Sequence, residues 1–410
     1  MTEASWHSEA AIEALFQLDR AEAEAEIRAA RTHPALEGFA QYHGQWEQRD
    51  EVAGTEFSRR FLYGLTFRKP LYHWGALEAN KRIGEILLRS ARENLASRRT
   101  FVRNEFFRRI LVLYIAQREG EFTESTLVFR KQLLEQAEAN HAQGVTTLQD
   151  LEAARMHHRN AFQSTLAARN HFRNARHQFL KDFSVSEEVF AKLPAELPPA
   201  VLDLAAWQSR MDTFREKTFR NHPEYRAAED AVQVQENQIL VDRARNRPVV
   251  DLVVGANQDD TSYMLTELDD RFRQIYFSGV RVSWNIFDGY ETRGRVELAR
   301  ALRDQAIDRK KRLARKLSQD ALQLLHELEN SQARMAAGRE TYAWKAEHYR
   351  KANTSFEAGQ ISAAALAHHR YDFQYQEHQA VLENARCLAL LLQAELLTTL
   401  GQPPMQASAP

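Results

Sequence analysis

The chain has 410 residues, a net charge of −1, a hydrophobic fraction of 44% and a charged fraction of 27%, which is typical of a folded protein and provides no bulk attraction to nucleic acid. Its single cysteine, Cys387, excludes a disulfide framework and a thiol-rich metal site. No apolar run approaches the roughly 18 residues of a membrane-spanning helix, and no phosphate loop, nucleophile elbow or zinc spacing occurs, so we expect no catalytic residues, no cofactor and no metal.

The sequence is a tandem repeat with a shift of 215 residues. The equivalent pairs are Gly64 and Gly279, Leu71 and Ile286, Tyr72 and Phe287, Leu87 and Leu302, Gly144 and Gly359, and Leu151 and Leu366. A shift that stays constant over most of the chain indicates a duplication. We predict a helix, a strand pair and a long helical hairpin in each repeat. The predicted boundaries are 1–183 for the first repeat, 184–206 for a proline-containing linker, 207–402 for the second repeat and 403–410 for a disordered tail.

Alternating patterns predict strand pairs at about 36–72 and about 249–287. Apolar or small residues occupy alternate positions in four runs: Leu36, Gly38, Ala40, Tyr42, Gly44 and Trp46; Phe61, Tyr63, Leu65 and Phe67; Val250, Leu252, Val254 and Ala256; and Tyr276, Val280, Val282 and Trp284. The pattern predicts two hairpins with polar loops at 50–56 and 259–271. A small soluble sheet fits this period. Strands of about 10 to 13 residues could also cross a bilayer when tilted, with Tyr42, Trp46, Tyr276 and Trp284 as a membrane aromatic band.

The remainder of each repeat is predicted to be a long helical hairpin, over 76–183 and 290–401. No proline occurs in 71–193 or 249–402, and a proline inside a helix costs about 3 kcal/mol. Apolar residues recur at helical spacing, as in Ile83, Leu87, Ala91 and Leu95. Each hairpin reverses at a glycine followed by a hydroxyl residue that can cap the next helix. Ordinary antiparallel coiled coils contain such turns as well.

Four strands in a membrane cannot stand alone, because open edges expose unpaired backbone groups to lipid. Two copies of the chain would supply eight strands, whose side chains fill the interior, whereas three copies would supply twelve and can leave a channel. If the chain is a membrane conduit, the sequence therefore favours a homotrimer. The helical hairpins would then form a second, helical barrel.

One stretch carries a family resemblance. Residues 278–289 read Ser-Gly-Val-Arg-Val-Ser-Trp-Asn-Ile-Phe-Asp-Gly, and this strand ending in Phe-Asp-Gly before a long helix resembles the TolC-type outer-membrane efflux proteins. The two glycine tips, the element Asn221-His222-Pro223 and the terminal Thr398-Thr399-Leu400-Gly401 are also similar to that family. The resemblance implies a mostly α fold with a small β part. It also implies a trimeric 12-stranded β-barrel in the outer membrane, continuous with an α-helical periplasmic barrel.

The resemblance also implies partners and sites. The tips would contact a periplasmic adaptor protein and through it an inner-membrane pump, with outer-membrane lipid around the barrel. The tip residues are Gly144, Val145, Thr146, Thr147, Leu148, Gly359, Gln360, Ile361 and Ser362. In the family, acidic residues after the second tip help to close the pore, but Ala365 and His368 occupy those positions here. Asp150 and Glu152 in the first copy are candidate lumen or gate carboxylates, and a solvated outer face is the alternative.

Two features depart from the family pattern. The first copy has Pro70-Leu71-Tyr72-His73-Trp74 in place of the Phe-Asp-Gly motif. The counterpart of 207–223, shifted back by 215, would begin before the first residue and end at about position 8, so the first repeat lacks most of its leading helix. No signal peptide precedes Ser5-Trp6, so we expect an incomplete start. The favoured function is an outer-membrane exit duct of a Gram-negative tripartite efflux or type I secretion system, projecting into the periplasm. The alternative is a soluble, elongated coiled-coil scaffold without transport activity.

Overall fold

The computed structural model describes residues 9–48, 55–183, 185, 187, 196–263 and 271–400. The predicted tail 403–410, most of the predicted loop 50–56 and part of the predicted linker 184–206 lie outside the described residues.

The chain forms two compact units, and each unit takes segments from both sequence repeats. The sheet unit comprises Phe16–Arg92 and Arg226–Lys311. The tip unit comprises Met1–Leu15, Glu93–Tyr225 and Arg312–Pro410. The unit boundaries therefore differ from the repeat boundaries.

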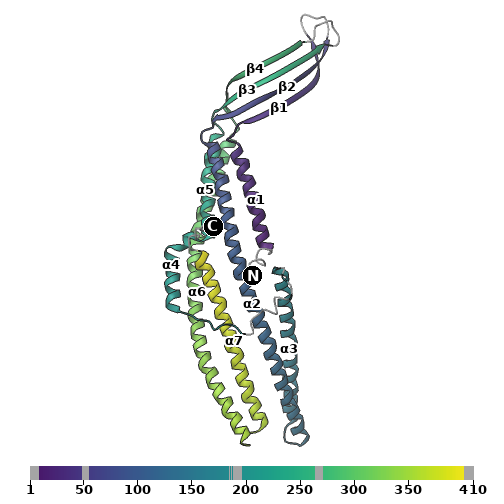
Figure 1. Ribbon diagram of the computed structural model, residues 1–410, viewed down its shortest axis with the longest axis vertical. Coiled ribbons are helices and arrows are strands. Elements are labelled where there is room, and N and C mark those ends of the chain that lie inside the picture. The colour runs from purple at the N-terminus through teal and green to yellow at the C-terminus, as the bar shows by residue number, and fades with distance from the viewer. Residues whose placement is uncertain are drawn as a thin grey trace, which may run out of the picture. The chain divides into compact units, whose positions relative to one another are not determined.

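The sheet unit contains one four-stranded antiparallel sheet with the order β1-β2-β3-β4 (Figure 1). The strands are β1 (Ala35–Gln48), β2 (Thr55–Tyr72), β3 (Val249–Tyr263) and β4 (Arg271–Ser283). Because β2 pairs with β3, the hairpins of the two repeats form a single sheet. β1 and β4 are its two edge strands.

β1, β2 and β3 are longer than the alternation predicted, and the predicted start of the second polar loop is wrong. Asp259 and Asp260 lie inside β3, paired in register with Leu62 and Phe61. The Asp259 carboxylate accepts a hydrogen bond from Arg60 Nε at 2.8 Å. Arg60 lies on the neighbouring strand β2, so the sheet itself pairs a charge that the sequence suggested was in a loop.

A register shift between Pro70 and Tyr72 marks a bulge, as expected where proline lacks a ladder donor.

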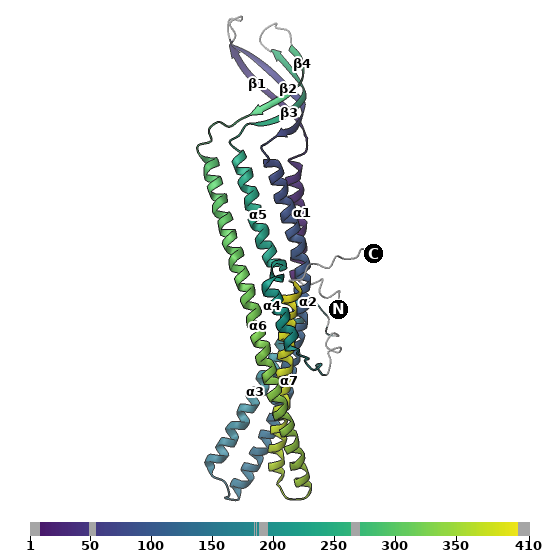
Figure 2. The same ribbon diagram turned by 90° about the vertical axis from the view of Figure 1, so that its left-hand side faces the viewer.

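Four helical segments of the sheet unit form a row in the order α1, α2, α5 and α6 (Figure 2). These are parts of α1 (Glu9–Ala30), α2 (Ala76–Ala142) and α6 (Glu291–Glu357), and most of α5 (Pro223–Ala244). Polar contacts connect each neighbouring pair: Arg28 with Asn80, Arg89 with Asp230, and Lys310 with Glu229.

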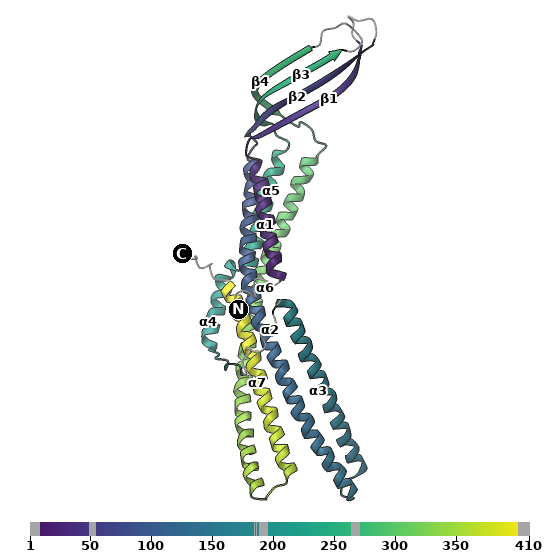
Figure 3. The ribbon, with the colours of Figure 1, turned by 45° about the vertical axis from the view of Figure 1, so that its right-hand side comes forward.

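The tip unit contains a second row of four helices in the order α3, α2, α7 and α6 (Figure 3). The two helices not yet introduced are α3 (Leu148–Phe183) and α7 (Ala363–Leu400). Phe106 of α2 packs on Phe179 of α3, Phe129 of α2 stacks on Tyr371 of α7, and Lys345 of α6 pairs with Asp372 of α7. α3 and α6 are therefore the outer helices of this row.

The helical stretch before the second strand pair is broken. α4 (Leu204–Glu216) is followed by a short 3-10 helix, η2 (Thr218–Asn221), and α5 then begins at Pro223. Proline disfavours helical backbone in the preceding residue but fits the first helical position, and His222 accordingly has a ψ of 131°. Met211 and Phe214 of α4 are buried in a core with Leu317, Ala321, Leu328 and Ala394.

Among the described residues, no helix carries an apolar stretch long enough to cross a membrane.

Candidate functional site

The two tips of the helical hairpins have the same backbone geometry. Gly144 and Gly359 have φ angles of 74° and 71°, in the left-handed region that favours glycine. Val145 N donates to Asn140 O and Gly144 N to His141 O, both at 2.9 Å. Gln360 N donates to Ser355 O at 2.8 Å and Gly359 N to Phe356 O at 2.9 Å. These paired bonds define a Schellman motif at both tips, which explains why the glycines recur in the two repeats.

The capping of the returning helices differs between the tips. At the first tip, Asp150 N donates to Thr147 Oγ1 at 3.1 Å, and the Asp150 carboxylate accepts from the Thr147 hydroxyl at 2.6 Å and from Thr147 N at 3.4 Å. This is a reciprocal capping box, with aspartate in the position usually taken by glutamate. At the second tip, Ala365 N donates to Ser362 Oγ at 3.2 Å, and alanine cannot bond back.

The predicted tip residues differ in exposure. Val145 and Leu148 are 71% and 61% exposed, whereas Ile361 is half-buried. The first tip therefore presents two large apolar side chains to solvent. The second tip presents mainly Gln360 and Ser362.

The structure gives the four candidate lumen or gate residues local partners. Asp150 belongs to the capping box described above, and Glu152 accepts from Arg155 Nη1 at 2.8 Å on the same helix. Ala365 donates its backbone N–H to Ser362, and the His368 ring lies edge-on against Phe129 at 5.1 Å. Within the described part of the chain, no hydrogen bond, ion pair or ring contact joins any two of the four.

A row of aromatic and histidine side chains between α2 and α7 was missed by the sequence analysis. Phe129 stacks on Tyr371 with ring centres 4.7 Å apart, and Phe122 stacks on His378 at 4.5 Å with the planes 5° apart. The signal was present, because Tyr371 and His378 lie seven residues apart on one face of a helix. It could not be recognised without knowing that α2 is the neighbour of α7.

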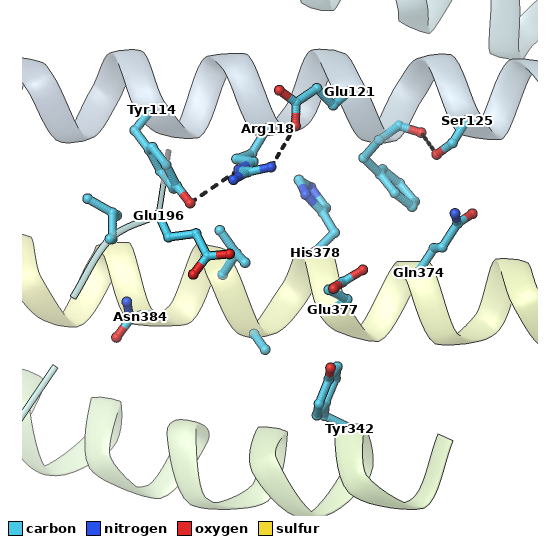
Figure 4. A pocket seen from close by; sticks show the side chains of 14 residues that line it. Tyr114, Arg118, Glu121, Ser125, Glu196, Tyr342, Gln374, Glu377, His378 and Asn384 are labelled. Atoms are coloured by element: carbon cyan, nitrogen blue, oxygen red, sulfur yellow. Dashed lines mark hydrogen bonds and ion pairs between the residues drawn. The ribbon is translucent and has the colours of Figure 1, made fainter. Parts of the chain in front are cut away.

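A groove of about 560 Å³ adjoins this row. Figure 4 shows Tyr114, Arg118, Glu121 and Ser125 on α2 facing Gln374, Glu377, His378 and Asn384 on α7, with Tyr342 on α6 and Glu196 from the linker. Arg118 donates to the Tyr114 hydroxyl at 3.1 Å and to Glu121 at 2.8 Å. Burial lowers the pKa of His378, and the nearby charge of Glu119 partly opposes that effect.

One residue that lines the groove, Asn384 of α7, binds the linker through two hydrogen bonds. The side-chain amide of Asn384 accepts from Ala200 N at 2.7 Å and donates to Pro198 O at 3.1 Å. In the described residues, no group of three or more His, Cys, Asp and Glu side chains could hold a metal ion.

The two faces of the sheet have opposite character. The register places Leu36, Tyr42, Trp46, Phe61, Leu65, Phe272, Tyr276 and Val280 on one face, where all eight are exposed. The other face carries charged pairs: Arg60 with Asp259 at 2.8 Å and Arg68 with Glu37 at 3.0 Å. An apolar face exposed to water is unfavourable, so this face requires lipid or protein around it.

Three of the four predicted band residues, Tyr42, Trp46 and Tyr276, lie on the apolar face. Trp284 follows the last residue of β4 and donates from its indole nitrogen to Asn246 O at 3.4 Å. Four further exposed aromatic residues lie at the end of β2 or in the segments that follow β2 and β4, and the sequence analysis did not single them out. These are Tyr72, Trp74, Phe287 and Tyr290.

The chain is similar to known outer-membrane proteins in sequence and in fold. The family model of outer membrane efflux proteins matches residues 8–181, whereas no curated protein sequence matches the chain. Among solved structures, the CmeC outer membrane channel of Campylobacter jejuni has a TM-score of 0.80 at 12% identity, covering 99% of this chain and 86% of that one. The outer membrane protein VceC of Vibrio cholerae has a TM-score of 0.75 at 15% identity, with coverages of 98% and 95%.

A membrane protein from Pseudomonas aeruginosa is similar to the same extent, with a TM-score of 0.75 at 17% identity over 97% of this chain and 92% of that one. At these identities the structures establish the fold, and the family match adds the sequence relationship for the first repeat. The resemblance to the TolC-type outer-membrane efflux proteins is therefore confirmed, by a family match over residues 8–181 and by a channel fold over nearly the whole chain.

Proposed function

We propose that this protein is an outer-membrane exit duct of a Gram-negative tripartite efflux or secretion system. It would passively conduct small molecules or polypeptide from an inner-membrane pump, through a periplasmic adaptor, to the exterior. The family match and the channel fold support the general class. The role involves no bond-making step and no cofactor.

The observation that carries the proposal is the two-faced sheet. Its exposed apolar face suits lipid, and its charged face suits a water-filled interior, which is the alternation of a membrane β-barrel. A soluble scaffold would have to cover the same eight large apolar side chains with other protein. The sheet thus favours the duct over the scaffold.

The edges of the sheet support a homotrimer. Among the described residues, β1 and β4 each have one side without a partner strand, and an unpaired strand edge in lipid costs several kcal/mol for each unsatisfied group. Three copies of the 4-stranded sheet would close a barrel of twelve strands, with β4 of one copy beside β1 of the next.

The adaptor is expected to bind at the tips. The exposed Val145 and Leu148 provide apolar anchors at the first tip, and the second tip offers the smaller surface around Ile361. Asp150 and Glu152 already have partners within the first turns of α3, at Thr147 and Arg155. We therefore assign both carboxylates a role in stabilising the start of this helix, and a gating role is not needed to explain them.

Two measurements test the proposal that the protein is an exit duct. Purified protein in detergent should have the mass of three chains by light scattering, and reconstituted vesicles should release an entrapped small dye faster than empty vesicles. A monomer with an intact sheet would contradict the barrel. A trimer that leaves the vesicles sealed would still be consistent with a barrel whose helical end is closed, so dye release should also be measured with the adaptor added. Sealed vesicles under both conditions would contradict the duct.

A further inference from the structure

The groove between α2 and α7 has the size and composition of a ligand-binding site. Its volume is about 560 Å³, within the range of about 300–1,000 Å³ that is usual for sites of small molecules. Its walls come from three helices and the linker, and all of them belong to the tip unit (Figure 4). The proposed function gives this groove no role.

Two carboxylates that line the groove carry uncompensated charge. Glu196 of the linker and Glu377 of α7 are exposed, and neither makes a hydrogen bond or an ion pair with any described residue. The third carboxylate, Glu121, is already neutralised, because Arg118 donates to it at 2.8 Å. The groove therefore retains two negative charges, which attract cations.

The histidine in the groove does not offset these charges at neutral pH. Burial lowers the pKa of His378 below its ordinary value of 6.5, so the ring is neutral at pH 7.5. The ring stacks on Phe122 with centres 4.5 Å apart. At this pH His378 therefore contributes an aromatic surface and no positive charge.

Further aromatic rings line the groove. Tyr114 is on α2, and Tyr342 extends from α6 toward α7 (Figure 4). The Tyr114 ring already contacts a cation, since the Arg118 guanidinium carbon lies 5.2 Å from the ring centre. This distance is within the reach of about 6 Å for a cation–π interaction. The groove thus has room for a positive charge against an aromatic ring.

The remaining lining favours an organic ligand over a bare ion. Leu197, Ala380 and Val381 provide apolar surface in the same groove, which suits a hydrocarbon part of a ligand. Within the described part of the chain, no group of three or more His, Cys, Asp and Glu side chains could hold a metal ion. The lining therefore fits an organic cation that carries an aromatic ring.

We propose that this groove binds an aromatic organic cation, whose positive charge is held by Glu196 and Glu377 and whose ring packs on the aromatic side chains. The site consists of residues of one chain, so it does not depend on the proposed duct or on its trimer. A bound cation would contact α2, α7 and the linker together, and it would therefore stabilise the folded protein.

Isothermal titration calorimetry of the full chain in detergent at pH 7.5 tests the ligand class. Benzyltrimethylammonium is the probe, and a titration into detergent alone is the blank. Tetramethylammonium, which lacks the ring, should bind about fivefold more weakly, and benzenesulfonate, which has the opposite charge, should not bind. Absence of binding by benzyltrimethylammonium would overturn the proposal, and so would equal affinity for either of the other two compounds.

Two substitutions test the location. Glu377→Gln should weaken binding by about threefold to fivefold, because it removes one of the two free charges. Tyr342→Leu should also weaken binding, because it removes a ring. The matched control is Glu395→Gln, which removes the same charge from an exposed position of α7 outside the groove and should bind as wild type does. Equal losses in Glu377→Gln and Glu395→Gln would show general attraction to negative charge and would overturn the site.

Thermal unfolding provides a second readout. Benzyltrimethylammonium should raise the melting temperature of the wild type, because it binds the folded state, and should raise it less in the double variant Glu196→Gln with Glu377→Gln. An equal rise in both proteins would place the ligand elsewhere and overturn the proposal. Dye release from vesicles is measured separately, so the groove and the duct can fail independently of one another.

Discussion

Two equivalent glycines show how position decides the importance of a residue. Gly64 in the central strand β2 and Gly279 in the edge strand β4 correspond in the two repeats. A Cβ atom at Gly64 would lie 2.6 Å from Ala256 O and would also clash with the Asn257 side chain, whereas a Cβ at Gly279 would have no neighbour within 4 Å. The requirement for glycine at 64 comes from the close approach of β3.

We predict that Gly64→Ala destabilises the sheet by about 1–3 kcal/mol, because the clash is with backbone that cannot move freely. Gly279→Ala should change stability by much less. Thermal unfolding of both variants, followed by circular dichroism in detergent, makes the comparison. Equal melting temperatures would mean that β2 and β3 separate more easily than the register indicates.

His378 is predicted to make stability depend on pH. Burial holds its pKa below the ordinary value of 6.5, so the unfolded chain binds the proton more readily than the folded chain. Its contribution is therefore fully present above about pH 6.5 and is lost as the pH falls through the lowered pKa. His222 is also buried with a lowered pKa and acts in the same direction.

The measurement is denaturant unfolding of wild type and His378→Phe between pH 7.5 and pH 5, with His171→Gln as a control on the exposed surface of α3. Phenylalanine should keep the stack on Phe122 and reduce the loss of stability in acid. An identical pH slope in wild type and His378→Phe would show that His378 does not control it.

At the level of elements, we predict that a lysine has different effects on the two faces of the sheet. Val280→Lys places a charge on the apolar face of β4, and Gln41→Lys places one on the charged face of β1, in both cases on an exposed edge-strand residue. In a membrane barrel, Val280→Lys should cost up to about 2–4 kcal/mol, whereas Gln41→Lys should be tolerated. Folding yield into lipid vesicles is the readout, and equal yields would argue against lipid contact at Val280.

The elements also show what the sequence could predict. The fold class and the family were predictable, because a 215-residue repeat, two glycine tips and the Phe-Asp-Gly stretch are local or periodic signals. The length of β3 was not, since Asp259 reads as a loop residue until Arg60 on the neighbouring strand is known. The stacking of His378 on Phe122 likewise depends on which segments become neighbours, whereas the break before Pro223 is a local effect of the proline on the preceding residue.

At the scale of the molecule, we expect the tips to tolerate substitution without loss of the proposed trimer. We predict that Val145→Asp leaves the trimer level in the outer membrane unchanged and weakens adaptor binding, because Val145 is 71% exposed and lies beyond the last helical turn of α2. Ala167→Asp, on the exposed surface of α3, is the control of equal charge. The assay is cross-linking to the adaptor in cells together with export. Normal export by Val145→Asp would place adaptor binding elsewhere.

The pairing of β2 with β3 also bears on how such a duct could arise and assemble. A protein with one repeat would need six separate molecules to complete the same ring, and each junction between hairpins would be a bimolecular encounter. Because β2 pairs with β3, two of these units lie on one polypeptide, and in the proposed trimer this would raise the effective concentration at half of the junctions and leave three bimolecular encounters. The two halves have diverged in detail, since the capping box is present at Thr147 and absent at Ser362.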